Sequence, residues 1–454
     1  MQCYISYMYI EQSPANEYME RFIIMSTLNE EIKQELDKLI LIANRYGDKE
    51  ITESFLWDIL ISSKTNQYVF YAIKDYLSEN DVKIVSDNLS VENMDETPDK
   101  DKKIKPYDTS KIDISPKTFS LDIYISRLEN NEIDLMPDFQ RKAGLWSQQQ
   151  KSQLIESLIL KIPLPAFYFD GSNNDNWIVI DGLQRLTTLK EFFIDKSLFL
   201  EGLEFLADLN GVCVSDMPRA YLRRMKETSI ISYIIDPGAP ANLKYNIFKR
   251  INTGGLKLEP QEIRHTLFQG YATRFIKKLA ETTKFKEATG YSIATERMLD
   301  REFVLRFIAF YELGVEEYEG TIDEYLNKAM ELINKKYPTD ILHAEKVERT
   351  FELVLDTSLQ IFGKFSFRRM PDEVKRRSIS KALFETWTSI MAKYEMDDLQ
   401  LLVELKKQLK EKYMPMFVDD EEFYNAIGSG KVASVRKRFE KIEKLIEEVL
   451  SYAP

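Results

Sequence analysis

Cysteine and histidine are nearly missing from this chain of 454 residues, which has two of each. Zinc sites, Cys–His catalysis and disulfide-stapled folds all need more of these residues than the chain supplies. The two histidines, His265 and His343, are also too far apart in sequence for the clustered pair of an HNH nuclease. We therefore expect a reduced chain in which oxygen ligands would hold any metal ion, as they do for Mg²⁺ or Mn²⁺.

Long apolar runs and an excess of positive charge are absent as well. No stretch of the sequence approaches the run of about 18 apolar residues that spans a membrane. The short apolar run at residues 3–10 lacks the preceding basic residues of a signal peptide, so we expect a cytoplasmic protein with no membrane partner. Acidic residues outnumber basic ones by 74 to 62, a net charge of −12. A role on nucleic acid would therefore need a local basic patch.

The composition that remains, 44% hydrophobic and 30% charged, is typical of a folded globular protein. Helical spacing of apolar residues predicts a small helical N-terminal unit within residues 1–91. Residues 92–106 are mostly Asp, Glu, Lys and Pro and predict a charged linker. Residues 107–270 mix strand and helix signals, and residues 271–454 predict a helical C-terminal domain. The expected fold class is α+β, with a mixed α/β core domain flanked by helical units.

Individual elements can be placed from periodicity and capping residues. β-branched and aromatic runs predict strands at 167–169, 177–180 and 229–236, and apolar spacing predicts a helix at 148–160. A short extended piece is expected at 82–85. In the C-terminal part we expect helices at 300–314, 321–337, 343–363, 372–394, 397–413 and 431–452.

One motif joins an apolar strand to an amphipathic helix through a tight turn, Asp181-Gly-Leu-Gln-Arg185. Unpaired amides and the helix dipole make such a helix start a site for anions, and Arg185 adds a planar fork that matches phosphate oxygens. The alternative is an ordinary turn in which Asp181 caps the helix and Arg185 makes a surface ion pair. A second Gln-Arg pair, Gln140-Arg141, follows an extended stretch, and we expect both pairs to face one cleft.

The order of these motifs resembles the N-terminal domain of GmrSD-type restriction endonucleases over roughly residues 115 to 315. The segments that carry the resemblance are Pro137-Asp-Phe-Gln-Arg141, Trp146-Ser147, Leu154-Ile-Glu-Ser157, Ile162-Pro-Leu-Pro165, Asp181-Gly-Leu-Gln-Arg185, Phe248-Lys-Arg-Ile-Asn252-Thr-Gly-Gly255, Gln261-Glu-Ile-Arg264 and Arg301-Glu-Phe-Val-Leu-Arg306.

The resemblance implies a core organised like that of the ParB and sulfiredoxin superfamily, whose members bind nucleotide phosphates at a strand-to-helix turn. It further implies a bacterial restriction or anti-phage system that couples nucleotide hydrolysis to nuclease action on foreign DNA. Asn252 has an alternative role, because Asn-Thr-Gly-Gly is also ordinary turn chemistry. The residues implied to line the nucleotide site are Gln140, Arg141, Asp181, Gly182, Gln184, Arg185, Thr187, Thr188 and Asn252.

The sequence departs from the family pattern in two ways. Leu183 stands where the family motif has its first Gln, which puts the nucleotide preference in doubt but leaves the phosphate cradle. An appended HNH domain, common in the family, is missing from a chain so poor in histidine. DNA cleavage would then come from the core domain itself or from a separate partner protein.

A hydrolytic mechanism can be written as a hypothesis on the same residues. Arg141 and Arg185 would stabilise charge on the transferring phosphoryl group, Asp181 would hold Mg²⁺ or Mn²⁺, and Gln184 would orient the attacking water. We accordingly expect Asp181, Gln184 and Arg185 to be catalytic and a nucleoside triphosphate to be the substrate. Two alternatives remain: a metal-dependent DNA nickase using the same cleft, and a non-enzymatic, nucleotide-gated module that recruits a nuclease or recognises a phage component.

Two basic motifs lie near the C-terminus. Gly428-Ser-Gly-Lys431 lacks the first glycine and the final Ser or Thr of a phosphate-binding loop, so we exclude that role. Arg436-Lys437-Arg438 lies on an amphipathic helix. This basic run is either an ordinary solvated face or a contact to the backbone of double-stranded DNA.

Overall fold

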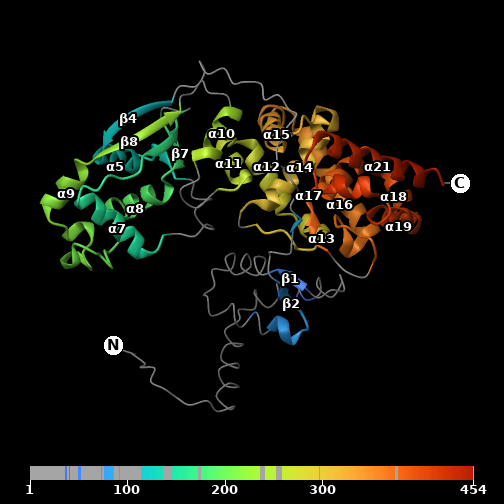
Figure 1. Ribbon diagram of the computed structural model, residues 1–454, viewed down its shortest axis with the longest axis horizontal. Helices are drawn as coiled ribbons and strands as arrows, with labels where there is room; N and C mark the ends of the chain where they lie inside the picture. Colours follow the sequence, from blue (N-terminus) through green and yellow to red (C-terminus); the bar gives the residue numbers. More distant parts are fainter. Residues whose placement is uncertain are drawn as a thin grey trace, which may run out of the picture.

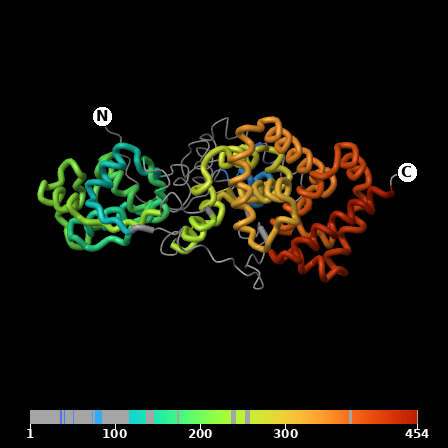
Figure 2. Tube along the Cα trace, turned by 90° about the horizontal axis from the view of Figure 1, so that it is seen from above, coloured from blue at the N-terminus to red at the C-terminus, as the bar shows by residue number. Residues whose placement is uncertain are grey.

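The computed structural model describes residues 36–37, 40, 50–52, 73, 76–85, 91–92, 114–135, 146–171, 175–235, 241–251, 258–295, 297–373 and 377–452. An α+β unit and a larger helical unit lie side by side, with helices α10 (Ala241–Ile251) and α11 (Pro260–Leu267) between them (Figures 1 and 2). The expected α+β fold class is confirmed.

The α+β unit is built on a five-stranded mixed sheet with the order β4-β8-β6-β7-β5. Strands β4 (Ile114–Ser120) and β8 (Ser229–Ile235) are antiparallel, and β8 is parallel to β6 (Phe167–Asp170). Strand β7 (Trp177–Asp181) runs antiparallel to β6 and parallel to β5 (Ile133–Asp134). The three strands predicted from β-branched and aromatic runs are therefore confirmed as the centre of the sheet, each within one residue at its ends.

Four helices cover one face of the sheet: α5 (Leu121–Glu129), α7 (Gln148–Ile159), α8 (Leu183–Phe193) and α9 (Arg219–Lys226) (Figure 1). Alternation along the strands decides what faces them, because successive side chains of a strand point to opposite faces. Phe167, Phe169, Trp177 and Val179 are buried with the helices in one core, together with Leu186 and Leu189 of α8.

The opposite face of the sheet meets α10 and α11. Ile180 and Ile235 from the sheet form a small core with Tyr245 and Phe248 of α10 and Ile263 of α11. A buried ion pair reinforces the contact, since Lys244 Nζ lies 2.9 Å from an oxygen of Asp170. These two helices therefore attach the sheet to the helical unit.

Two helices, α14 (Leu299–Leu313) and α17 (Lys381–Met391), form the centre of the helical unit. Residues 302–310 of α14 and 382–391 of α17 are buried on every side, as expected for helices enclosed by others. The surrounding helices cover them and supply most of the apolar core. The helices are α12 (Tyr271–Ala280), α13 (Thr283–Thr289), α14 (Leu299–Leu313), α15 (Ile322–Lys336), α16 (Ile341–Phe362), α17 (Lys381–Met391), α18 (Met396–Glu404), α19 (Lys406–Tyr413), α20 (Glu421–Ile427) and α21 (Val432–Leu450).

Two of the predicted C-terminal helices were wrong in extent. The prediction of one helix over 372–394 fails because Ile379–Ser380 form strand β9, and Ser380 then caps α17 by accepting from the Leu383 amide. The prediction over 397–413 fails because the chain turns at Leu405 between α18 and α19. The other four helices begin and end within two residues of their predicted limits.

The N-terminal region is described only in part. β1 (Glu50–Thr52) pairs in parallel with β2 (Lys83–Val85), which confirms the expected extended piece. β3 (Val91–Glu92) pairs in parallel with Ile379–Ser380, so the chain is held on the helical unit where the predicted linker would begin. Most of the helical pattern predicted for residues 1–91, and residues 93–106 of the linker, lie outside the described residues. A search of the described helices finds none with the length and apolarity needed to cross a membrane.

Candidate functional site

Gly182 makes the turn between strand β7 and helix α8. Its φ is +101°, in the left-handed region that favours glycine. A Cβ added there would lie 2.2 Å from Cδ1 of Phe167, which is closer than any side chain could tolerate. Both the backbone angle and the space therefore require glycine at the strand-to-helix junction.

Arg185 folds back from the first turn of α8 onto this junction. Its Nη2 donates to Oδ2 of Asp181 at 2.7 Å and to the carbonyl of Ala166 at 3.3 Å, and Nη1 donates to the carbonyl of Pro165. The guanidinium carbon also lies 4.7 Å from the centroid of the Phe167 ring. Arg185 thus joins the segment before β6 to the end of β7, by a more buried version of the ion pair that the sequence allowed.

The burial of the Arg185–Asp181 pair is uneven. The Arg185 side chain is 10% exposed and that of Asp181 is 32% exposed. Burial lowers the pKa of Arg185, and the adjacent carboxylate opposes that shift. Asp181 uses Oδ2 for the pair, and its Oδ1 has no hydrogen-bond partner among the described residues. One carboxylate oxygen at the junction is therefore available to a ligand or a cation.

The N-cap of α8 is Gly182, so no side chain of the N-cap residue caps the helix, and none from the described residues does so. The first-turn amides of a helix have no partner within the helix, so an uncapped start attracts an anion. No group of three or more His, Cys, Asp or Glu side chains that could hold a metal occurs within the described ranges. If Asp181 binds Mg²⁺ or Mn²⁺ as predicted, other ligands such as phosphate oxygens and water must complete the site.

Gln184 connects the junction to the chain that enters α7. Its Oε1 accepts from the backbone amide of Trp146 at 3.3 Å. On the other side, Asp134 of β5 pairs with Ile178 of β7. The chain is therefore attached to β7–α8 on both sides of segment 136–145, which holds Gln140 and Arg141. Those two residues and Asn252 lie outside the described residues.

The two threonines of α8 bond within their own helix. Thr187 Oγ1 donates to the Leu183 carbonyl at 2.9 Å, and Thr188 Oγ1 donates to the Gln184 carbonyl at 2.8 Å. Thr187 is half-buried, whereas Thr188 is completely buried. The expectation that Thr188 lines a nucleotide site is corrected here, because its side chain is completely buried and its hydroxyl is used within the helix. Thr187 remains a candidate.

An aromatic pair that the sequence reasoning missed lies beside Asp181. Tyr168 pairs with Asp181 between strands β6 and β7, and its ring stacks on Tyr233 of β8 with centroids 4.9 Å apart. Burial raises the pKa of Tyr168, with smaller contributions from Tyr233 and Asp181. The sequence Phe167-Tyr168-Phe169 could have indicated this pair, because alternation along a strand places Tyr168 on the opposite face of the sheet from the two phenylalanines.

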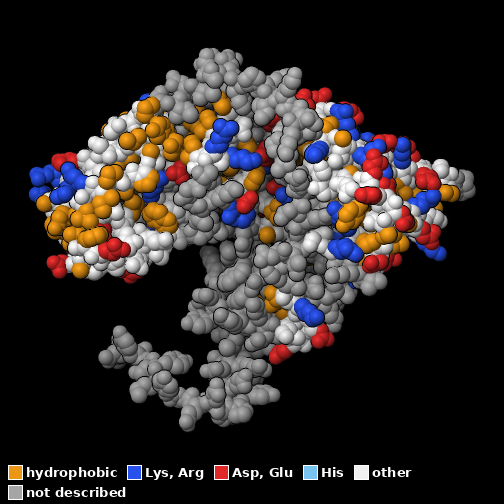
Figure 3. Space-filling view, in the orientation of Figure 1, with side chains coloured by type: hydrophobic (Ala, Val, Ile, Leu, Met, Phe, Trp, Pro, Cys, Tyr) orange, Lys and Arg blue, Asp and Glu red, His pale blue; other side chains and the backbone are white. Residues whose placement is uncertain are grey.

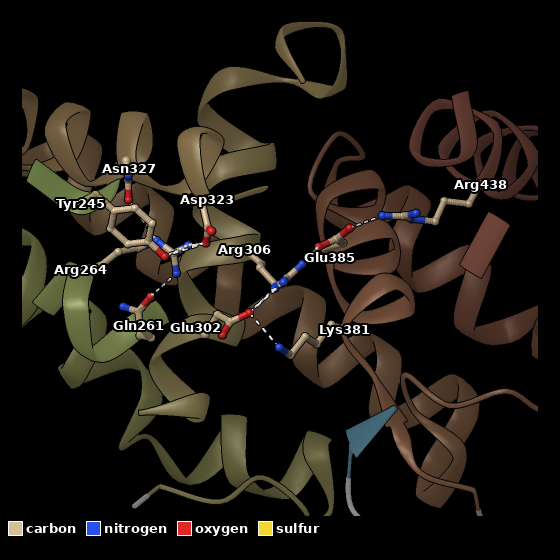
Figure 4. Close-up of polar contacts among 10 residues, drawn as sticks. All are labelled: Tyr245, Gln261, Arg264, Glu302, Arg306, Asp323, Asn327, Lys381, Glu385 and Arg438. Atoms are coloured by element: carbon tan, nitrogen blue, oxygen red, sulfur yellow. Dashed lines mark hydrogen bonds and ion pairs between the residues drawn. The ribbon is translucent and has the colours of Figure 1, made fainter. Parts of the chain in front are cut away.

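The later motif residues form a buried polar network instead of a site at the junction (Figure 4). Arg264 is almost fully buried; it contacts Asp323, and its Nε donates to Oδ1 of Asn327 at 3.1 Å. Asp323 also accepts from the Tyr245 hydroxyl at 2.8 Å and from Lys249 Nζ at 2.7 Å. One aspartate of α15 therefore holds both connecting helices, α10 and α11, on the helical unit.

A second part of the network crosses the centre of the helical unit. Arg306 lies 2.8 Å from both Glu302 and Glu385, and Lys381 lies 3.0 Å from Glu302. Burial raises the pKa of Glu302, but Lys381 and Arg306 outweigh it and hold that pKa below its usual range. Glu385 in turn contacts Arg438 of α21 (Figure 4). The buried charges are thus paired, as buried charges must be.

The prediction that Arg438 contacts DNA is wrong in this structure. The residue is completely buried between Glu385 and the carbonyls of Ala426 and Ser429. Lys437 is half-buried and lies 3.3 Å from Glu422, and the exposed Arg436 lies 3.3 Å from Glu316. The groove beside Arg436 is lined by Glu316, Glu440, Glu443 and Glu447 together with Arg436 and Lys444, so acidic side chains outnumber basic ones where DNA would need a basic face.

The junction, the helix start and the Tyr168–Tyr233 pair all fall within one stretch of similarity to known proteins. No curated protein and no solved structure matches the chain. The predicted ParB-like detail of the core stays a prediction. Residues 124–269 match the family model of the GmrSD restriction endonuclease, N-terminal domain, so the resemblance expected from the motifs is confirmed over that range.

Proposed function

We propose that this protein works in a bacterial restriction or anti-phage system and that its α+β unit binds a nucleoside triphosphate at the β7–α8 junction. The family match of residues 124–269 supports the first part. The single observation that supports the second is the uncapped start of α8 beside a carboxylate that is one-third exposed.

The residues around the junction divide the recognition of a triphosphate among them. First-turn amides of α8 would bind phosphate oxygens, and Oδ1 of Asp181 would hold the Mg²⁺ or Mn²⁺ that accompanies them. Such an ion supplies charge neutralisation when it is bound. Gln184, already fixed to the Trp146 amide, would direct its side-chain amide toward the ligand. Arg141 would reach the phosphates from segment 136–145.

The contacts of Arg185 bear on whether the protein hydrolyses the nucleotide or uses it as a switch. In this conformation its guanidinium is engaged by Asp181 and two carbonyls. A triphosphate that drew Arg185 away would release the segment at residues 165–166. Differential affinity for the two arrangements would then make the nucleotide a switch. This observation favours the nucleotide-gated module as a second candidate function, in which nuclease action belongs to a partner.

Phosphate release from ATP, GTP, CTP and UTP, with and without double-stranded DNA, tests hydrolysis. We expect Arg185→Lys, which keeps the charge but loses the planar fork, to lower turnover at least tenfold. Lys190→Gln is the matched control on the same helix, where Lys190 makes an exposed ion pair with Asp195. Turnover by Arg185→Lys equal to wild type rules out the catalytic role, and binding without turnover in wild type selects the gated module.

The nickase alternative needs its own assay. Supercoiled plasmid incubated with the purified chain and Mg²⁺ or Mn²⁺ would be converted to the open circle if this chain cuts one strand. We expect no conversion by the chain alone, because the proposed cleft is used for the nucleotide. If wild type converts the plasmid and Asp181→Asn does not, this chain itself cuts DNA, and Asp181 belongs to the cleavage site.

A further inference from the structure

Helix α9 places four cations on the end of the α+β unit that is furthest from the helical unit (Figure 1). They are Arg219, Arg223, Arg224 and Lys226, and the eight residues of the helix include no acidic one. The space-filling view shows Lys and Arg side chains gathered at the same end of the molecule (Figure 3). In a chain of net charge −12, this is a local basic patch.

The α9 cations are held out to solvent. Met225 is buried, and Tyr221 and Leu222 pack on the core of the α+β unit, so the helix has a fixed inner face. The Arg223 side chain is 77% exposed and lies 4.0 Å from Glu227, and Lys226 pairs with Asp122 at 2.9 Å. Arg219 and Arg224 make no ion pair within the part of the chain that the structure describes. The contrast with α21, where acidic residues surround the cations, is clear.

A groove runs along the basic face of α9. It encloses about 730 Å³ and is lined by Arg219, Arg223 and Lys226 on one side and by Ser120 and Asp122 on the other. Ser120 precedes α5 and gives it no side-chain cap, so the positive end of that helix dipole adds to the three cations. Asp122 and Glu227 only partly offset this charge.

The shape and chemistry of the groove decide what it fits. Arg219, Arg223 and Lys226 recur at the helical repeat and extend about 10 Å along one face. That length matches successive phosphates of one strand, and guanidinium forks bind phosphate oxygens in pairs. A concave groove fits a narrow phosphodiester backbone better than a flat surface. Arginine supplies three of the four cations, which is typical of nucleic-acid contacts.

We propose that α9 and the groove beside it bind the backbone of double-stranded DNA. The proposal rests on the proposed function only in taking DNA as the target, since the contacts lie apart from the β7–α8 junction. Backbone contacts carry no sequence information, so the surface supplies affinity and orientation for any duplex.

Fluorescence anisotropy of a labelled 30-base-pair duplex, titrated with the full chain at several salt concentrations, tests this surface. The test variant is Arg219→Gln/Arg223→Gln/Lys226→Gln, and the matched control is Arg436→Gln/Lys437→Gln/Lys444→Gln on α21. We expect the α9 variant to lose at least tenfold in affinity and to lower the salt slope by about two to three, since each lost phosphate contact removes roughly 0.9. The control should bind like wild type.

Several results would overturn the proposal. They are no duplex binding by wild type, an unchanged affinity and slope in the α9 variant, an equal loss in the α21 control, or stronger competition by a single-stranded RNA of the same length. Calorimetric titration of triphosphates into the α9 variant separates the two proposals. If the α9 variant binds nucleotide like wild type, the nucleotide site at the junction is independent of α9. If wild type binds no nucleotide, the proposed nucleotide site is rejected, and the DNA result at α9 still stands.

Discussion

Arg185 and Asp181 face each other across the β7–α8 junction, with 2.7 Å between Nη2 and Oδ2. The same guanidinium also donates to the Pro165 and Ala166 carbonyls, so Arg185 links residues 165–166 to the end of β7. A ligand that competes for Arg185 therefore changes the packing of residues 165–166 as well as its own site.

Replacing Arg185 with Ala should lower the free energy of unfolding by about 2–4 kcal/mol, because it leaves a partly buried carboxylate and two carbonyls without their donor. Urea denaturation followed by circular dichroism measures the change. Lys190→Gln, which removes an exposed pair with Asp195, should cost less than about 1 kcal/mol. Equal losses of unfolding free energy in the two variants would show that the contacts of Arg185 do not stabilise the fold more than an exposed ion pair.

Gly182→Ala should lower the free energy of unfolding by about 3 kcal/mol, since it combines a left-handed φ with a clash against the Phe167 ring. Gly211→Ala is the matched control, because Gly211 has φ +82° but open space around its Cβ position. It should cost only about 1 kcal/mol. Chemical denaturation of both variants checks the difference, and equal costs would mean that space at the junction is not limiting.

Asp323→Ala should lower the free energy of unfolding by about 3–5 kcal/mol, because Arg264 would stay buried without its carboxylate. Replacing both residues, as Asp323→Ala with Arg264→Leu, should restore part of that loss. A double-mutant cycle in urea measures the coupling. Additive losses, with no coupling between the two positions, would show that the pair does not hold α11 on α15.

Acid should weaken the attachment between the two units. Burial raises the pKa of Asp323, but Arg264 and Lys249 outweigh burial and hold that pKa below its usual range. A carboxylate with a lowered pKa in the folded state stabilises the fold above its unfolded pKa, and this stability is lost as pH falls through the folded value. The free energy of unfolding should therefore fall below about pH 5, and less steeply in Asp323→Asn. Parallel pH profiles for the two proteins would contradict the assignment.

Local patterns predicted the centre of the fold well. The runs at 167–169, 177–180 and 229–236 became β6, β7 and β8 because β-branched and aromatic side chains suit the strands of a sheet that is packed against other elements. Strand β4 and helix α5 were not predicted. Ile114–Ser120 includes proline and polar residues, as an edge strand can, and so gives a weak strand signal.

Long-range pairs were beyond the reach of sequence patterns. Val91 pairs with Ile379, and Arg264 meets Asp323 from another helix, so neither contact leaves a periodic signal. The basic run of α9 was visible as four cations in eight residues, but only its exposure separates it from Arg436–Arg438, where Arg438 is buried. For the candidate site, the Asp181–Arg185 turn was predictable. The inward direction of Arg185 was not, because it depends on contacts with Pro165 and Phe167, which belong to another segment of the chain.

Binding of a triphosphate at the β7–α8 junction is tested most directly by calorimetric titration of ATP, GTP, CTP and UTP with Mg²⁺ into wild type, Gln184→Glu and Gln149→Glu. Gln184→Glu keeps the oxygen that accepts from Trp146 and adds a negative charge at the start of α8, while Gln149→Glu makes the same change at the start of α7. We predict that at least one triphosphate binds wild type with a Kd below about 100 µM, that Gln184→Glu weakens it at least tenfold, and that Gln149→Glu binds like wild type. No binding by wild type, or equal affinity in all three proteins, would contradict a nucleotide site at this junction.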